Sequence, residues 1–376
     1  MKILESIYRA DSTGRIRHLV AMILFTVLLP VVAPAADTTP EAYLDSLISL
    51  TNQYTHMDRD STRYFADKIV EFAKAQDDPV LLSKAYNNYG YIYYRWNKLD
   101  SSEAYLQQAI GISQEHMDRR GEGIATNRLG NVYWFKEQPL EAKRHYERAK
   151  SLHETVGNPE GIGRALNNLA NIYREWGDYQ RAIQLYIEAR DYYQKADYKE
   201  GVAWLDFSLT ILYKNLNEYD QALESINRSV EMYKNIAESS KDSTGLMICY
   251  GQLGDIYNLM GQYEEGLKYH LRAMKMRKRT GIKTAYADGL AGVGQSYFKL
   301  GNYEKSLRYF KHAQQLREEA NSLRGSETNL KYIGFIYHET GRDTKALEYL
   351  TRGLQVAREL NERGTNFRTD VPHLCQ

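Results

Sequence analysis

The sequence predicts an all-α solenoid of about eight antiparallel helix pairs. The first observation behind this prediction is a tyrosine that recurs every 40 residues, with one step of 44. The tyrosine ladder comprises Tyr93, Tyr133, Tyr173, Tyr213, Tyr257, Tyr297 and Tyr337. Self-similarity at a fixed period of about 20–50 residues is typical of stacked repeats.

The second observation is a pattern of small and large residues around each ladder tyrosine. A small residue stands three positions before the tyrosine, another mostly small one nine positions after it, and a third sixteen positions after it. A larger residue always lies thirteen positions after the tyrosine: Leu106, Tyr146, Tyr186, Ile226, His270, Phe310 and Leu350. Such spacing predicts two antiparallel helices whose backbones approach at the small residues while the larger side chains fill the gaps.

The third observation is the turn between the two helices. One turn position holds Gly177, Gly261, Gly301 and Gly341, and in two other repeats Asn97 and Asn217. Glycine and asparagine accept the left-handed conformation that ends a helix. We therefore expect each helix pair to be joined by a tight turn.

With these positions in place, the chain resembles the tetratricopeptide repeat (TPR) family over about residues 43–360. The signature of Leu-Gly, Tyr, Ala, an aromatic residue and Ala is met most fully at 129–149 and 169–189. The missing Trp and the longer period are departures, and the period is similar to that of the 40-residue TPR subclass. The resemblance implies a right-handed superhelical solenoid, in which the extra residues are expected to lengthen the second helix and its loop.

In chain order, the predicted elements begin with a signal peptide or signal anchor at residues 1–35. Arg15 and Arg17 precede an uncharged apolar run at 19–29, and Ala33-Pro34-Ala35 follows. A basic region, a short apolar run and an Ala-x-Ala site favour cleavage after Ala35 and export. An uncleaved signal anchor and a buried helix are the alternatives, but the run is shorter than the roughly 20 residues of a spanning helix.

The repeats follow as a divergent first TPR at 43–76 and seven clear repeats at 77–360. The one 44-residue step falls in the polar stretch 238–245, which predicts a longer loop. A domain boundary there is the alternative. Residues 361–376 are expected to form an uncapped tail, because Pro372 and the end of the sequence prevent another first helix. That uncapped end is a surface that could contact a partner.

Composition and motifs argue against several functional classes. The net charge of +1 gives no electrostatic case for nucleic acid. Two distant cysteines, Cys249 and Cys375, predict neither a metal site nor a disulfide framework. Zincin, P-loop and nucleophile-elbow motifs are absent, and the glycine-rich segment 289–294 falls within a predicted helix. We expect no enzymatic activity, no cofactor and no metal.

Binding is expected on the first helices, which in TPR arrays line the concave side. The candidate residues are the positions there that packing does not use. They are Asn87, Asn88, Tyr94, Arg95, Asn127, Arg128, Asn131, Trp134, Asn167, Asn168, Asn171 and Arg174. Asparagine amides can bracket a peptide backbone, while arginine and aromatic side chains supply anchors.

For the asparagines, the alternative is a structural role, because they can bond between neighbouring helices.

Similar arrays form the extracytoplasmic sensory regions of bacterial membrane-bound histidine kinases and helix-turn-helix regulators. That resemblance implies an exported, periplasmic or envelope module that binds a protein or peptide in signalling, with membrane contact only through an uncleaved leader. Kinase and DNA-binding parts are absent from this sequence. An envelope assembly or secretion scaffold is the rival hypothesis, and an enzyme with an unrecognised site is the third.

Overall fold

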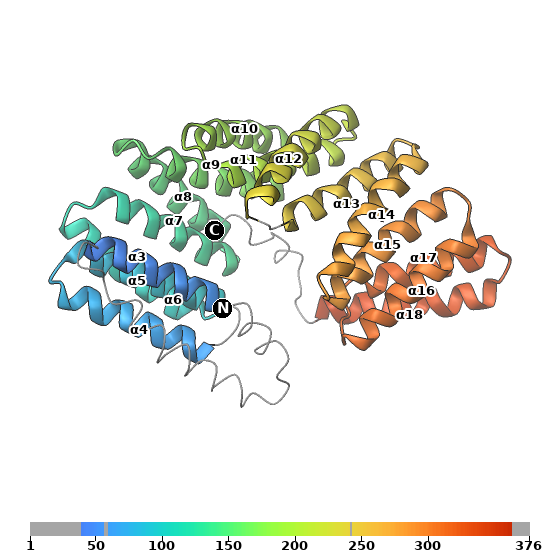
Figure 1. Cartoon of the computed structure of the whole chain (residues 1–376), viewed down its shortest axis with the longest axis horizontal. Helices are drawn as coiled ribbons and strands as arrows, with labels where there is room; N and C mark the ends of the chain where they lie inside the picture. Colours follow the sequence, from blue (N-terminus) through green and yellow to red (C-terminus); the bar gives the residue numbers. More distant parts are fainter. Residues whose placement is uncertain (1–38, 56–58, 241–242, 363–376) are drawn as a thin grey trace. The chain divides into compact units, whose positions relative to one another are not determined.

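The computed structural model describes residues 39–55, 59–240 and 243–362, and the regular structure in these ranges is helical throughout (Figure 1). The helices form eight consecutive pairs, which confirms the predicted all-α helical repeat array. The pairs are α3 (Pro40–Tyr54) with α4 (Arg59–Ala75), α5 (Pro79–Arg95) with α6 (Leu99–Glu115), α7 (Arg119–Phe135) with α8 (Pro139–Thr155), α9 (Pro159–Glu175) with α10 (Tyr179–Lys195), α11 (Lys199–Asn215) with α12 (Tyr219–Ser240), α13 (Thr244–Leu259) with α14 (Tyr263–Arg279), α15 (Lys283–Lys299) with α16 (Tyr303–Glu319), and α17 (Ser326–Glu339) with α18 (Asp343–Glu362). The predicted leader at 1–35 and residues 363–376 of the predicted tail lie outside the described ranges.

The chain divides into two compact units, and the boundary falls inside α9, between Ile172 and Tyr173. In the N-terminal unit the first helices α3, α5 and α7 contact one another in succession, and α4 and α6 each also pack against the following first helix. In the C-terminal unit α13, α15 and α17 repeat this arrangement, with α14 and α16 between them. In each of these two series, the successive first helices therefore lie side by side.

The turns explain the 40-residue period. Helices of 17 residues alternate with three-residue turns from α4 to α11, and a residue of positive φ recurs every 20 positions from Asp77 to Asn217 and from Gly261 to Gly341. Each ladder tyrosine lies in the last turn of its first helix, where its carbonyl accepts the N–H of the residue five positions later at 2.8–2.9 Å. This is the Schellman arrangement that closes a helix. The expectation that the extra residues lengthen the second helix and its loop was wrong, because in these pairs both helices have 17 residues and the turns have three.

The prediction of a longer loop at 238–245 was also wrong, because most of these residues are helical. Helix α12 continues to Ser240 and has 22 residues, and α13 begins at Thr244. The inserted residues therefore extend a second helix. Serine, lysine and glutamate are all tolerated in helices, so the polar composition of the stretch did not by itself require a loop.

The two helices of a pair interlock at the small residues. An added Cβ at Gly130 of α7 would lie 2.5 Å from the ring of Tyr146 in α8, and one at Gly90 would lie 2.5 Å from Leu106. The small residue of the second helix secures the same contact, since Ser102 Oγ donates to the Gly90 carbonyl at 2.6 Å. The predicted close approach of backbones is confirmed at these pairs.

The tyrosine ladder adds a second contact within the pair. Five of the seven rings pack against the aromatic ring twelve residues later, with ring centroids 5.0–5.6 Å apart. The partners are Tyr105, His145, Tyr269, Tyr309 and Tyr349. Offset aromatic pairs at such separations are favourable, so the ladder has a packing role.

One repeat junction of the N-terminal unit is built around a histidine. His153 of α8 is buried between two glycines: an added Cβ would lie 2.7 Å from its ring at Gly123 and 2.4 Å from it at Gly161. Burial lowers the pKa of this imidazole to about 4, with Arg120 and Arg164 lowering it further and Glu160 opposing them. The folded state therefore holds His153 neutral.

Gly130→Ala should lower the free energy of unfolding by about 1–3 kcal/mol, because the new methyl group collides with Tyr146. Gly111→Ala is the matched control, since an added Cβ there meets nothing within 4 Å. This change should raise the free energy of unfolding by about 0.5–1 kcal/mol, as expected for alanine in a helix interior. Urea denaturation measures both, and equal effects would disprove the interlock.

Stability should fall as the pH drops from about 6.5 to about 4. The unfolded chain binds a proton at His153 in this range and the folded chain does not, so the stability present above pH 6.5 is lost toward pH 4. A shift of this size corresponds to about 3 kcal/mol. His153→Leu should reduce the pH dependence of the urea midpoint, with His145 and His270, whose pKa values burial also lowers, supplying part of what remains. His116→Leu, at an exposed position, should leave the slope intact.

Candidate peptide-binding face

All twelve predicted binding residues lie on the first helices α5, α7 and α9. Eleven belong to the N-terminal unit, and Arg174 belongs to the C-terminal unit. Capping fixes the start of two of these helices: Asp78 accepts the N–H groups of Val80 and Leu81 ahead of α5, and Asp118 accepts that of Gly121 ahead of α7. The candidate residues follow in the second half of each helix.

Five of the candidates form two sets of hydrogen bonds between neighbouring first helices. Arg128 of α7 donates from Nη1 to the carbonyl and the Oδ1 of Asn87 in α5, at 3.0 and 2.9 Å. Asn168 of α9 donates from Nδ2 to the Oδ1 atoms of Asn127 and Asn131 in α7, at 3.3 and 3.2 Å. We call Asn87, Asn127, Arg128, Asn131 and Asn168 the amide network. Its donors reach back to the preceding repeat, so the structural role considered for the asparagines applies to these residues.

The amide network stops at Asn88, which is the counterpart of Arg128 and Asn168 one and two repeats earlier. Asn88 is 1% exposed, and neither atom of its amide has a hydrogen-bond partner among the described residues. The counterpart of Asn87 in the divergent first repeat is Leu47, whose side chain offers no acceptor. Burial of an unpaired amide costs free energy, so Asn88 is a point of local instability.

Arg128 is the most constrained charged group on this face. Its guanidinium lies over the ring of Tyr91, 4.9 Å from the centroid, while Nη1 is bonded to Asn87. Burial lowers the pKa of Arg128 to about 10; Tyr91 acts in the opposite direction and Arg164 adds to the lowering. The surroundings therefore disfavour its charge.

The remaining anchors are half-buried side chains. Tyr94 meets Phe135 edge to face, with ring centroids 5.1 Å apart. Trp134 and Arg95 are partly exposed near the ends of their helices. Arg174 donates from Nη1 to the Tyr186 hydroxyl at 3.4 Å. Part of each side chain is accessible to a partner, although the structure does not bring Arg174 into the amide network.

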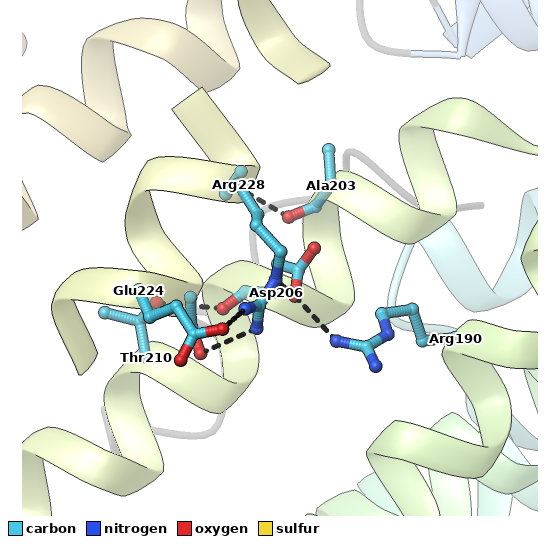
Figure 2. Close-up of polar contacts among 8 residues, drawn as sticks. Arg190, Ala203, Asp206, Thr210, Glu224 and Arg228 are labelled. Carbon is cyan, nitrogen blue, oxygen red and sulfur yellow. Dashed lines mark hydrogen bonds and ion pairs between the residues drawn. The ribbon is translucent and has the colours of Figure 1, made fainter. Parts of the chain in front are cut away.

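Two buried carboxylates escaped the sequence analysis. Asp206 of α11, only 2% exposed, accepts from Arg190 Nη1 at 3.2 Å and from Arg228 Nε at 3.0 Å (Figure 2). Glu122 of α7 is fully buried against Arg148 and Arg119. At the positions equivalent to Glu122 and Asp206, a neighbouring repeat carries Ile162 and Leu166, respectively. An acidic residue where other repeats have an uncharged one was the signal available in the sequence.

The donors around Glu122 control its ionisation. Burial would raise the pKa of this carboxyl, but hydrogen bonds from Gln114 and Arg148 lower it below its ordinary value. Glu122 is thus a charged anchor that ties α6, α7 and α8 together. A carboxylate held ionised by fixed donors is suited to packing and not to proton transfer.

The described part of the chain contains no group of three His, Cys, Asp or Glu side chains placed to hold a metal ion. Burial raises the pKa of the Cys249 thiol to about 12, so it is a poor nucleophile. The glycine-rich segment 289–294 lies inside α15, away from any loop that could cradle phosphate. None of the helices in the described ranges has both the length and the apolar content needed to cross a bilayer.

Comparison with known proteins identifies the repeat. Family models described as tetratricopeptide repeat match residues 83–116, 122–195, 164–235, 246–319 and 284–359. Comparison with curated protein sequences gave no match.

Three solved structures illustrate the similarity in fold. A signal transduction ATPase with numerous domains and a tetratricopeptide repeat sensor, from Pyrococcus horikoshii, has a TM-score of 0.64 at 14% identity, covering 95% of this chain and 55% of that one. A Rap protein complexed with competence and sporulation factor has a TM-score of 0.55 at 12% identity, covering 96% of this chain and 97% of that one. Aspartyl phosphate phosphatase F from Bacillus subtilis has a TM-score of 0.51 at 14% identity, with 86% and 96% covered. At these identities the likeness concerns the fold alone.

A double-mutant cycle on Asn127→Ala and Asn168→Ala should give a coupling energy of about 0.5–1.5 kcal/mol in the free energy of unfolding, because each change removes the same interhelix hydrogen bond. Urea denaturation of the four proteins measures it. Strictly additive effects would contradict a structural role for this pair.

Proposed function

Because this chain belongs to the tetratricopeptide repeat family, we propose that it is a non-catalytic scaffold that binds a peptide or protein partner along α5, α7 and α9. The repeat family supports the general role, since TPR arrays are protein-binding scaffolds. The finer statements, the location of the face and the sensory role outside the cytoplasm, are our proposal.

The observation that carries the location is the run of polar and aromatic groups across three successive first helices. Neighbouring packed helices lie about 8–10 Å apart, and an extended chain advances about 3.3 Å per residue. A peptide crossing these helices would therefore meet a new set of amides and anchors about every three residues. Arg128 Nη1 and Asn168 Nδ2 donate hydrogen bonds within the amide network. The Asn side chains nevertheless retain further lone pairs and N–H groups for a ligand.

A role outside the cytoplasm is supported by the leader that the sequence predicts at 1–35, from its basic residues, apolar run and Ala-x-Ala site. Intact-mass measurement of the protein purified from its native cells tests this part. Cleavage after Ala35 predicts a chain that begins at Ala36. A mass that includes the leader would favour an uncleaved anchor.

A sensory role is supported by two of the similar folds, one described as a tetratricopeptide repeat sensor and one solved with a bound factor. The resemblance to sensory regions of histidine kinases and helix-turn-helix regulators stays a prediction. The rival role is an envelope assembly scaffold. A sensor should bind a short peptide, whereas an assembly scaffold should copurify with large envelope proteins.

Site-specific photocrosslinking tests the binding face. A photoreactive phenylalanine analogue at position 134 of α7 should capture a discrete partner in the native cell envelope, identified by mass spectrometry. The matched control is the same group at Leu140 of α8, which is 64% exposed on a second helix. Equal capture at both positions, or at position 140 alone, would contradict the assignment.

Trp134→Ala should weaken binding of the captured partner by at least about 30-fold, since a buried aromatic anchor contributes about 2 kcal/mol or more. The urea midpoint should shift far less than in Gly130→Ala, because Trp134 is only half-buried. Calorimetric titration and denaturation together separate the two effects. Unchanged affinity would exclude Trp134 from the interface.

A further inference from the structure

We propose that α17 and α18, the last helices labelled in Figure 1, pair with the same helices of a second copy of this chain. The surface concerned consists of Phe335 on α17 and of Leu347 and Leu354 on α18, and we call it the terminal face. These three side chains are 41%, 69% and 54% exposed. The terminal face shares no residue with the proposed peptide-binding face, so the inference goes beyond the proposed function.

The positions of the terminal face have a defined role in earlier repeats. Their counterparts there include, in the same order, Asn131, Glu103 and Met274. Asn131 accepts a hydrogen bond from α9, and Glu103 accepts one from α7 at 2.7 Å. Met274 lies against α15, where an added Cβ at Gly289 would be 2.8 Å from its Cα. Each position thus contacts the first helix of the following pair.

In α17 and α18 the same positions carry exposed apolar side chains. No helix follows α18 within the described ranges. Terminal repeats of a soluble array need a polar outer face, and a contiguous apolar surface marks a site of association. The terminal face therefore has the composition of an interface.

The order of residues along α18 identifies the occupant as a second copy. The exposed row on this helix comprises Asp343, Leu347, Leu354 and Arg358. Spacings of four, seven and four residues keep the row on one side of the helix. The acid and the first leucine lie as far before the midpoint of the row as the arginine and the second leucine lie after it.

This symmetry makes the row complementary to itself. Antiparallel packing of two copies of α18 about a two-fold axis at the midpoint places Asp343 of each copy beside Arg358 of the other. It also places Leu347 of each copy beside Leu354 of the other. Such self-complementarity is what a two-fold interface between identical chains requires.

The same charges disfavour a parallel arrangement, which would set each acid against an acid and each arginine against an arginine. Asp343 Oδ1 lies 2.7 Å from His338 Nδ1, yet the Asp343 side chain is 75% exposed. A carboxylate accepts several hydrogen bonds, so this contact leaves Asp343 accessible to a second copy.

Two substitutions test both the surface and the antiparallel register. Leu347→Glu and Leu354→Lys introduce good helix formers at exposed positions, so α18 should be retained. Either change alone sets a charge against a leucine twice in the dimer and should prevent pairing. In a mixture of the two variants, the new glutamate of one chain meets the new lysine of the other, and the second contact is leucine against leucine. Leu140→Glu, at a 64% exposed leucine of α8, is the matched control.

Sedimentation equilibrium of the full chain measures the outcome, with circular dichroism to verify helicity. Because a helix-pair interface is small, we expect wild type and Leu140→Glu to dimerise with a dissociation constant of about 1–100 μM. Leu347→Glu and Leu354→Lys should each weaken dimerisation at least about tenfold, and their equimolar mixture should recover it.

Four results would each overturn the inference. They are a wild type that stays monomeric up to about 100 μM, an equal loss in Leu140→Glu, dimers that persist in both terminal-face variants, and a mixture that stays monomeric. A monomeric wild type whose urea midpoint falls in Leu347→Glu would show instead that another segment of the same chain covers the terminal face.

Discussion

The close approach of the two helices within each repeat is the constraint on which the rest of the structure depends. Gly90 and Gly130 have no side chain because Leu106 and Tyr146 occupy the space where a Cβ would stand. From α4 to α11, helices of equal length and three-residue turns keep these pairs in register. Once the interlock fixes each pair, the first helices lie side by side, and the side chains that bridge them are positioned as a consequence.

The polar groups divide into two kinds according to how they are compensated. Asp206 and Glu122 hold arginines from neighbouring helices, so these charges are neutralised inside the fold. The amide network is neutral apart from Arg128, and Asn88 at its end has no partner among the described residues. Compensation inside the fold produces rigid junctions. At Asn88, which is 1% exposed, the absence of compensation leaves a buried amide unpaired.

Much of the fold could be predicted because its signals recur. The ladder tyrosines, the small residues and the turn positions repeat seven times, so local exceptions such as Glu137 at a turn position did not obscure them. The stretch 238–245 occurs once, and its polar composition is compatible with both a loop and a helix, so the longer α12 could not be inferred. The predicted array therefore agrees with the structure, whereas the one irregular segment does not.

The candidate site was harder to predict, because a side chain's role depends on a residue about 40 positions away. Asn168 is bonded because Asn127 and Asn131 precede it, and Asn88 is unpaired because Leu47 stands where an acceptor is needed. Single repeats do not reveal this. The buried acids Glu122 and Asp206 each occur in one repeat only, so no periodic signal marked them.

In the amide network, each donor side chain bonds to an acceptor in the preceding repeat. These bonds therefore form only when the repeats follow one another in the right order. Asn168 requires the amides of the preceding repeat, and Arg128 requires Asn87. A tandem duplication of residues 119–158 would give Arg128 a preceding Asn127 in the second copy and so preserve a polar acceptor at each new junction. Exchanging that segment with the first repeat would place Arg128 where it has no preceding amide. Duplication of a central repeat therefore preserves these hydrogen bonds, whereas exchange of a central repeat with the first one does not.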